Sequence, residues 1–234
     1  MIVVIPSYEP SHKLCHLVES LCATPGDHRV LVVNDGSDPR FDEVFDEVRL
    51  SGAIVVEHRP NRGKGYALKR GFRYIFEHFP GEDVVCADSD GQHTVTDILA
   101  IAAEIDSHRD LIVLGARGFT GEIPLRSRFG NAATRIALRV ASGLRIQDTQ
   151  TGLRAYPAAL LPWLGTIEGE RFEYELNVLL QAKRRNISVV EVPIATIYID
   201  DNASSHFRPL VDSVRLYLPL LKFAMSSLTA AALD

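Results

Sequence analysis

Short runs of β-branched residues alternate with amphipathic stretches along the first half of the chain, and this alternation restricts the possible folds more than any other feature. The runs with the length and composition of buried strands are Ile2–Ile5, Val30–Val33, Ala53–Val56, Val84–Ala87 and Leu111–Leu114. The stretches between them carry apolar residues three or four positions apart, which indicates helices. Because strands joined by helices run parallel, we predict an α/β protein with a mostly parallel central sheet flanked by helices.

The alternation of strands and helices is interrupted near residue 116, at the start of the second half. A Gly- and Arg-rich loop is followed by a helix over Arg126–Ala141, a polar turn at Gln147–Gly152, a helix over Phe172–Arg185, and two short strands, Ile187–Val192 and Ile194–Ile199. The final segment is apolar and has a helical pattern. We therefore expect one domain over residues 1–208, followed over residues 209–234 by an amphipathic or apolar helix that packs on the domain or lies at a membrane surface.

Composition argues against several classes of protein. The 234 residues are 46% hydrophobic, which is typical of a globular chain. The net charge of −5 and the pI near 5.9 argue against a nucleic-acid partner. Cys15 and Cys22 lie about two turns apart on one predicted helix, too far for a disulfide, so a cytoplasmic location fits best. No run reaches the roughly 20 uninterrupted apolar residues of a membrane-spanning helix.

Polar residues follow the second and third predicted strands. Asp35 ends the second strand, where an open α/β sheet presents its ligand crevice, and its carboxylate can accept hydrogen bonds from a base or a ribose. The alternative is a simple turn in which Asp38 caps the next helix. The segment Asn61–Gly65 opens the third helix with two glycines and the cations Arg62 and Lys64, which is typical of an anion site or of a solvated turn. It lacks the spacing of a P-loop or of a dinucleotide-binding loop.

The segment from Asp88 to His93 is the most informative part of the chain. Asp88 and Asp90 follow a buried strand at i and i+2, so that both carboxylates can face one hard divalent cation. Without such a cation, two carboxylates this close would repel each other. Gln92 or His93 can complete or orient the ligand shell. The position of the pair at the tip of the fourth strand favours a functional role over a chance Asp-x-Asp loop.

Arginines are concentrated between residues 117 and 145, where six arginines accompany one acidic residue. Arg117, Arg126 and Arg128 fall where the regular alternation is interrupted, and guanidinium groups suit phosphate oxygens, so this excess favours an anionic ligand. The second half also carries carboxylates that can act as bases or cap helices, and sequence periodicity does not choose between these roles. These are Asp148, Glu173 and Glu175.

Seven motifs, taken in order along nearly the whole chain, resemble the family 2 glycosyltransferases. They are Ile5–Glu9, Asn34–Ser37, Asn61–Gly65, Asp88–Gln92, Gly115–Arg117, Asp148–Arg154 and Phe172–Glu175. Within that family the chain most resembles the polyprenyl-phosphate glycosyltransferases, the branch that includes dolichol-phosphate mannose synthase, and Ser204–Pro209 is similar to bacterial members of it. The chain departs from the pattern at Asn34, where many relatives have a second acid, and this bears on selectivity for the base.

The resemblance implies a GT-A fold with a Rossmann-like sheet, and a metal-dependent hexosyltransferase that uses a UDP- or GDP-linked sugar and inverts the anomeric carbon. By motif match, the nucleotide-sugar pocket would be lined by Pro6, Tyr8, Glu9, Asp35, Lys64 and Asp88. Asp88, Asp90 and Gln92 would hold Mg²⁺ or Mn²⁺, and Arg117, Arg126 and Arg128 would bind the acceptor phosphate or the leaving group. The candidate catalytic residues are Asp90, Arg117, Arg128, Asp148, Glu173 and Glu175.

The expected acceptor is a polyprenyl phosphate, and the protein would then act at the inner face of the cell membrane, peripherally or with a membrane-embedded partner. A phosphate is already ionised near pH 7, so its attack needs positioning more than a general base. A second hypothesis is transfer to a sugar hydroxyl in polysaccharide or glycoconjugate synthesis, where Asp148, Glu173 or Glu175 would take the proton. A third is a non-catalytic nucleotide-sugar-binding domain, against which the Asp88/Asp90 pair argues.

Overall fold

The computed structural model describes residues 1–108, 110–118, 134–140, 142–195, 220, 221 and 223. Its seven strands form one sheet in the order β3-β2-β1-β4-β6-β5-β7, and β6 alone among them runs antiparallel to its neighbours. The strands are β1 (Ile2–Ser7), β2 (Arg29–Asp35), β3 (Ile54–His58), β4 (Val84–Cys86), β5 (Leu111–Arg117), β6 (Arg154–Tyr156) and β7 (Ser188–Ile194). The prediction of a mostly parallel sheet is therefore confirmed.

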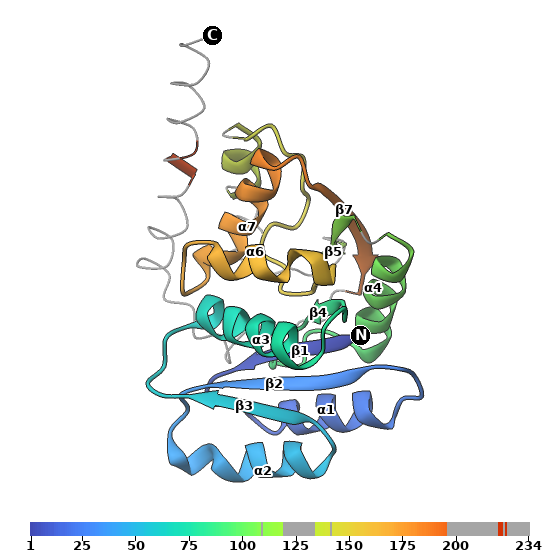
Figure 1. Cartoon of the computed structure of the whole chain (residues 1–234), viewed down its shortest axis with the longest axis vertical. Helices are drawn as coiled ribbons and strands as arrows, with labels where there is room; N and C mark the ends of the chain where they lie inside the picture. The colour runs from blue at the N-terminus through green and yellow to red at the C-terminus, as the bar shows by residue number, and fades with distance from the viewer. Residues whose placement is uncertain (109, 119–133, 141, 196–219, 222, 224–234) are drawn as a thin grey trace.

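Helices cover both faces of this sheet. Figure 1 shows α1 and α2 on one side of the part built from β1, β2 and β3, and α3 on the other side. Residues 134–140 are also helical. The named helices are α1 (Lys13–Ala23), η1 (Pro39–Phe41), α2 (Asp42–Leu50), α3 (Lys64–His78), α4 (Val95–Ser107), η2 (Ala158–Leu160), α6 (Leu161–Thr166) and α7 (Glu173–Arg184).

The core consists of two apolar layers, one on each face of the sheet. Successive side chains of a strand point to opposite faces, so Ile2 and Val4 pack in one layer with α3, α6 and α7. Val3 and Ile5 pack in the other layer with α1, α2 and α4. All six residues of β1 are buried because both of its faces are covered, which explains why its sequence is almost continuously apolar.

Two strands differ from the sequence prediction. β6 was not predicted, because three residues are too few to produce a periodic signal. The two strands expected on either side of Pro193 are one strand, β7, over the described residues. Pro193 is paired with Ala116 in the register of β5 and β7, and β7 lies at the edge of the sheet, where a residue without an N–H is tolerated.

Several predicted features lie largely outside the described residues. The boundary between residues 208 and 209 and the first part of the helix predicted over Arg126–Ala141 both fall there. The predicted C-terminal apolar helix is not seen as a whole, since its described residues are Leu220, Leu221 and Phe223. Phe223 is buried, and the guanidinium of Arg184 lies 4.5 Å from its ring centre. Over the residues that can be described, no helix combines the length and apolarity needed to cross a membrane.

Candidate active site

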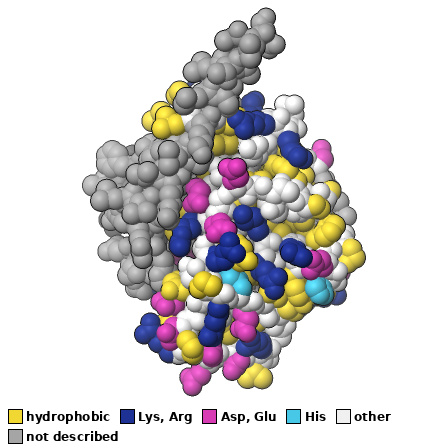
Figure 2. Space-filling model, turned by 60° about the vertical axis from the view of Figure 1, so that its left-hand side comes forward, with side chains coloured by type: hydrophobic (Ala, Val, Ile, Leu, Met, Phe, Trp, Pro, Cys, Tyr) yellow, Lys and Arg dark blue, Asp and Glu magenta, His cyan; other side chains and the backbone are white. Residues whose placement is uncertain are grey.

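The carboxyl ends of β1, β2 and β4 meet where the order of the sheet reverses. From β1 the chain continues to β2 and β3 on one side, and β4 then pairs with the other side of β1. In open α/β sheets, ligands bind at the carboxyl ends of the two strands where the order reverses in this way, which are β1 and β4 here. Of the residues of β1, only Ile2–Val4 pair with β4, so Pro6, which has no N–H, lies beyond this ladder. Figure 2 brings forward the side toward which β3 points in Figure 1, and there acidic and basic side chains are interleaved.

Asp35 organises the loop that leads into α3. Its carboxylate accepts hydrogen bonds from the backbone N–H groups of Arg62 (2.9 Å) and Gly63 (2.7 Å) and from the Asn61 side chain (2.8 Å), and His58 Nε2 lies 2.8 Å away. The segment predicted as an anion site or a solvated turn thus binds an internal carboxylate through its backbone N–H groups. His58 was missed by the sequence analysis, because a single histidine at a strand end carries no pattern. Asp38 caps η1 through Arg40, as predicted.

Lys64 joins two acidic residues that come from different parts of the chain. Its ammonium lies 2.7 Å from Asp88 and 3.1 Å from Glu175, although Glu175 comes from α7, more than a hundred residues later in the chain. Burial by itself would lower the pKa of Lys64, but the charges of the two carboxylates outweigh it and raise this pKa. The same pairing, assisted by His93, holds the pKa of Asp88 well below its usual range despite burial. Lys64 is therefore positively charged and fixed in place.

Asp90 is the second carboxylate of the Asp88/Asp90 pair, and it lies beside Asp88 in a partly buried place. Its Oδ1 accepts a hydrogen bond from the Gln92 N–H, and burial followed by the charge of Asp88 raises its pKa. A hard divalent cation prefers oxygen ligands and would remove this repulsion. The donor set therefore fits Mg²⁺ or Mn²⁺ held by Asp90 and Asp88. Gln92, predicted as a third ligand, contacts Asp90 through its backbone N–H, and its role as a ligand stays a prediction.

Buried polar atoms without a hydrogen-bond partner gather around this crevice. Such atoms are uncommon in folded proteins and call for an explanation. In the described part of the chain they are Ser7 Oγ, His58 Nδ1, His93 Nδ1, Glu173 Oε2 and Glu175 Oε1, all within or beside the segments named above. A polar ligand at the carboxyl ends of β1 and β4 would supply partners for Ser7 Oγ and His93 Nδ1.

Gly152 packs directly against the carboxylate of Asp88. A Cβ atom at this position would stand 2.1 Å from Asp88 Oδ2, closer than any non-bonded contact allows. The backbone of the turn after Asp148 therefore packs against the carboxylate of Asp88, the predicted metal ligand, and leaves no room for a side chain at residue 152.

Gly152→Ala should accordingly displace Asp88 and lower the rate of the metal-dependent reaction predicted from the sequence about 10–100-fold, because a shift of about 1 Å at a reacting centre has effects of this size. Gly165→Ala is the matched control, since nothing lies within 4 Å of the Cβ it adds. Initial rates at saturating metal measure the effect. Equal rates for the two variants would contradict the assigned contact.

Asp148 holds Arg117 in a fixed orientation. Asp148 is fully buried, and its two oxygens accept from Arg117 Nε (2.6 Å) and Nη2 (3.1 Å). The backbone N–H of Asp148 in turn donates to Glu191 on β7. Both residues were predicted to be catalytic, and the structure brings them together as a pair in which Asp148 positions the guanidinium.

Arg154 was quoted in a motif but received no role, and the structure places it under the crevice. Its side chain is 1% exposed and donates to the backbone carbonyls of Thr149, Thr151 and Glu175. Its Nε lies 3.7 Å from Glu175 Oε1. The charge pattern alone did not distinguish this buried arginine from the exposed ones nearby.

The other predicted residues are placed as follows. Glu173 Oε1 accepts from the backbone N–H groups of Glu170 and Arg171, so one of its oxygens caps the start of α7. Glu9 has a positive φ of 48° and joins the end of β2 through its N–H, which donates to Ser37. Burial, followed by the charge of Glu9, raises the pKa of Tyr8. Arg126 and Arg128 lie outside the described residues.

Comparison with known proteins decides the family. A model described as glycosyl transferase family 2 matches residues 2–160, more than half of the chain. The chain belongs to this family. Related proteins include the UDP-N-acetylglucosamine–dolichyl-phosphate N-acetylglucosaminyltransferase of Methanococcus voltae, 27% identical over 85% of this chain and 86% of the relative. The polyprenol monophosphomannose synthase of Mycolicibacterium smegmatis is 25% identical over 82% and 76%.

A solved structure supports the GT-A-like fold of this family 2 glycosyltransferase. Glucosyl-3-phosphoglycerate synthase from Mycobacterium tuberculosis, crystallised with Mn²⁺, UDP and phosphoglyceric acid, is matched with a TM-score of 0.70. The match covers 95% of this chain and 78% of that protein, at 18% identity. At this identity the likeness shows the fold, and the chemistry has to be argued from the residues of this chain.

Proposed function

We propose that this family 2 glycosyltransferase moves a sugar, with inversion, from a UDP- or GDP-linked donor to a polyprenyl phosphate. The proposal rests on the interactions of the three carboxylates that were predicted as possible general bases. Asp148 is paired with Arg117, Glu175 with Lys64, and Glu173 caps backbone N–H groups. An acceptor that arrives ionised needs no residue to remove its proton. Both oxygens of Asp148 and one oxygen each of Glu173 and Glu175 are already bound, although Glu173 Oε2 and Glu175 Oε1 keep no hydrogen-bond partner. This engagement favours a phosphate acceptor over a sugar hydroxyl.

We assign the residues at this end of the sheet to three roles: binding the nucleotide, holding the metal and binding the acceptor phosphate. Tyr8, Glu9 and Asp35, at the ends of β1 and β2, belong to the nucleotide side, with Asp35 shaping the loop before α3 rather than offering a free carboxylate. Asp88 and Asp90 would hold Mg²⁺ or Mn²⁺, whose charge stabilises the departing nucleotide diphosphate. Arg117, held by Asp148, is one cation for the acceptor phosphate, and Arg126 and Arg128 remain predicted partners.

The relatives support the acceptor class. The names of the Methanococcus voltae and Mycolicibacterium smegmatis proteins specify a dolichyl phosphate and a polyprenol monophosphate. A third relative, from Haloferax volcanii, is named dolichyl-phosphate hexose transferase and is 27% identical over 82% of this chain. A lipid phosphate lies at a membrane, so the proposal includes peripheral binding at the inner face of the cell membrane, with residues 209–234 as a helix that packs on the domain or rests on lipid.

A described helical segment also suits a lipid surface. Ile136 and Val140 stand four residues apart at 60% and 82% exposure, and the exposed Arg135 and Arg139 flank them. Exposed apolar residues beside arginines can bind at the boundary between headgroups and acyl chains. This segment therefore offers a second contact with the membrane, next to the proposed C-terminal helix.

Val140→Asp should reduce the fraction of protein that sediments with anionic liposomes by about half or more, because it replaces an apolar contact with a charge repelled by the lipid. Leu50→Asp is the matched control, since Leu50 on α2 is 89% exposed and equally apolar. Liposome co-sedimentation measures both. A loss of the same size in the control would assign the effect to net charge alone.

The function itself is tested by incubating the protein with Mn²⁺ or Mg²⁺, a panel of UDP- and GDP-sugars and a short polyprenyl phosphate. Mass spectrometry of the lipid fraction is expected to reveal a phosphosugar lipid from one donor. If donor and metal bind but the sugar appears on a hydroxyl acceptor instead, the second hypothesis replaces the proposal. Absence of donor turnover with either acceptor would favour the non-catalytic binding domain.

A further inference from the structure

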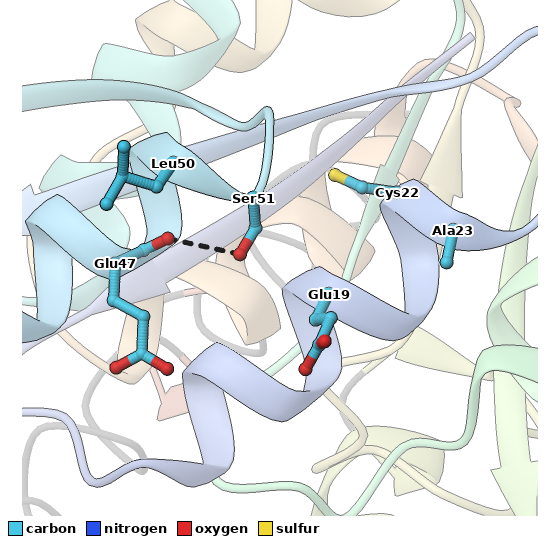
Figure 3. Close-up of a pocket in the computed structure, with 6 residues that line it drawn as sticks. All are labelled: Glu19, Cys22, Ala23, Glu47, Leu50 and Ser51. Atoms are coloured by element: carbon cyan, nitrogen blue, oxygen red, sulfur yellow. Dashed lines mark hydrogen bonds between the residues drawn. The ribbon is translucent and has the colours of Figure 1, made fainter.

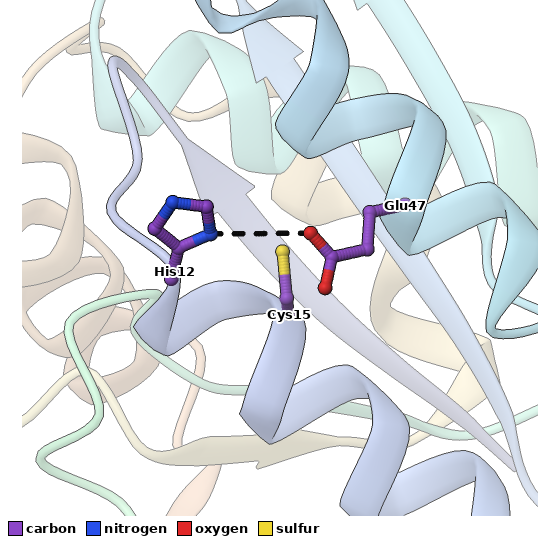
Figure 4. A group of neighbouring side chains, drawn as sticks. All are labelled: His12, Cys15 and Glu47. Carbon is purple, nitrogen blue, oxygen red and sulfur yellow. Dashed lines mark ion pairs between the residues drawn. The ribbon is translucent and has the colours of Figure 1, made fainter.

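A group of three metal-ligating side chains lies between α1 and α2, away from the Asp88/Asp90 crevice. His12 and Cys15 are three residues apart and so share one face at the start of α1, and Glu47 comes from the facing helix α2. One donor atom from each side chain lies within 4.8 Å of the other two. Figure 4 shows the three side chains pointing toward one another. We propose that they form a binding site for a zinc ion.

One distance between donor atoms is close to that of a zinc site, and the others are within reach of side-chain rotation. Zinc bond lengths of about 2.0–2.3 Å in tetrahedral geometry place donor atoms roughly 3.3–3.6 Å apart. His12 Nδ1 and Glu47 Oε2 are 3.9 Å apart. The side chains of His12 and Glu47 are 81% and 55% exposed, so both can rotate toward the ion without disturbing the core. Cys15 is buried and already fixed, with its Sγ 3.8 Å from the carbonyl of Val44.

The donor types select the metal. A thiolate and an imidazole prefer Zn²⁺ to Mg²⁺ or Mn²⁺, which take oxygen ligands, so this group differs in chemistry from the Asp88/Asp90 pair. The exposed side of the group leaves a fourth position for water. Glu19 and Glu47 line the adjoining hollow between the two helices, drawn in Figure 3, and their charges favour a cation there.

Binding at this site includes the release of a proton. Burial, followed by the hydrogen bond and the charge of Glu47, raises the pKa of the Cys15 thiol to about 11, so the free thiol carries its proton at neutral pH. The zinc–sulfur bond forms as the S–H bond breaks, and the proton passes to the buffer. The charge of the metal then offsets that of the thiolate and of Glu47.

The ion would connect two loops that lead from the sheet. His12 follows the loop after β1, and Glu47 is on the helix reached through the loop after β2. These loops meet through the Glu9 N–H, which donates to Ser37 Oγ at 2.9 Å, and through an ion pair between Arg40 and the Glu9 carboxylate at 3.9 Å. Bonds through zinc would add a further link, so occupancy is expected to raise the Tm of the whole chain by a few degrees.

Cobalt substitution tests the site directly, because a Co²⁺–thiolate bond absorbs light whereas Co²⁺ bound by carboxylates lacks that charge-transfer band. The full chain with Asp90→Asn, stripped with chelator, is titrated with Co²⁺ and then Zn²⁺. One Co²⁺ per chain with a thiolate band, displaced by Zn²⁺, is expected. Cys15→Ser should abolish the band and Cys22→Ser, at an exposed cysteine outside the group, should retain it.

His12→Ala and Glu47→Gln change exposed side chains and leave the core intact, so they keep the test decisive if Cys15→Ser folds poorly. Each should weaken Co²⁺ binding more than about tenfold. A chain with no thiolate band, or a band that survives Cys15→Ser or is unaffected by His12→Ala, would overturn the proposal. None of these readouts requires sugar transfer, so the result is independent of the proposed function.

Discussion

Asp90→Asn is expected to lower metal-dependent sugar transfer by at least about 100-fold while the protein remains folded. The amide keeps the shape of the carboxylate but removes its charge, and metal ligands that stabilise a developing negative charge contribute effects of this size. The substitution also removes the charge of Asp90, whose pKa is raised by burial and then by repulsion from Asp88. A carboxylate with a raised pKa in the folded state costs stability at neutral pH, so the variant should be at least as stable as the parent chain.

Initial rates over a series of Mn²⁺ concentrations, together with urea unfolding, measure the two effects separately. Asp46→Asn provides the control, because Asp46 lies on α2 in an exposed pair with Arg49. Activity should fall in the Asp90 variant alone. If transfer by that variant remained metal-dependent and within a few-fold of the parent rate, the assignment of Asp90 as a metal ligand would be wrong.

Arg154→Met is expected to lower the free energy of unfolding by about 3–5 kcal/mol, the usual cost of removing one partner from a buried ionic network. The substitution leaves three backbone carbonyls without their donor and takes a positive charge from beside Glu175. Lys64 still contacts Glu175 but is shared with Asp88. The substitution should therefore disturb the positions of Glu175 and Lys64 in the active site as well as lower the stability of the fold.

Chemical denaturation of the two arginine variants compares a buried with an exposed position. Arg73→Leu is the control, since Arg73 pairs with Glu77 on the surface of α3 and exposed pairs contribute little. Its unfolding midpoint should stay near that of the parent. If both variants unfolded at the same urea concentration, the interactions of Arg154 would contribute no more to the free energy of unfolding than an exposed ion pair does.

The regular part of the fold was predictable because its signals are local. β1 and β2 are short, continuous apolar runs, and α3 carries apolar residues three or four positions apart, so each pattern can be recognised within a short window of sequence. β6 and the role of Arg154 were not predictable, because a three-residue strand and a buried arginine acquire their environment from segments far along the chain.

The sequence by itself determined the family and the parallel sheet, and it predicted a set of candidate site residues, since short motifs at strand ends carry that information. The tertiary structure alone decided which residues are available for chemistry. Asp35 is engaged by the loop before α3, and Asp148 is engaged by Arg117. Lys64 lies between Asp88 and Glu175, which are distant in sequence. Electrostatic partners are chosen by distance in space, and spacing along one chain does not encode that distance.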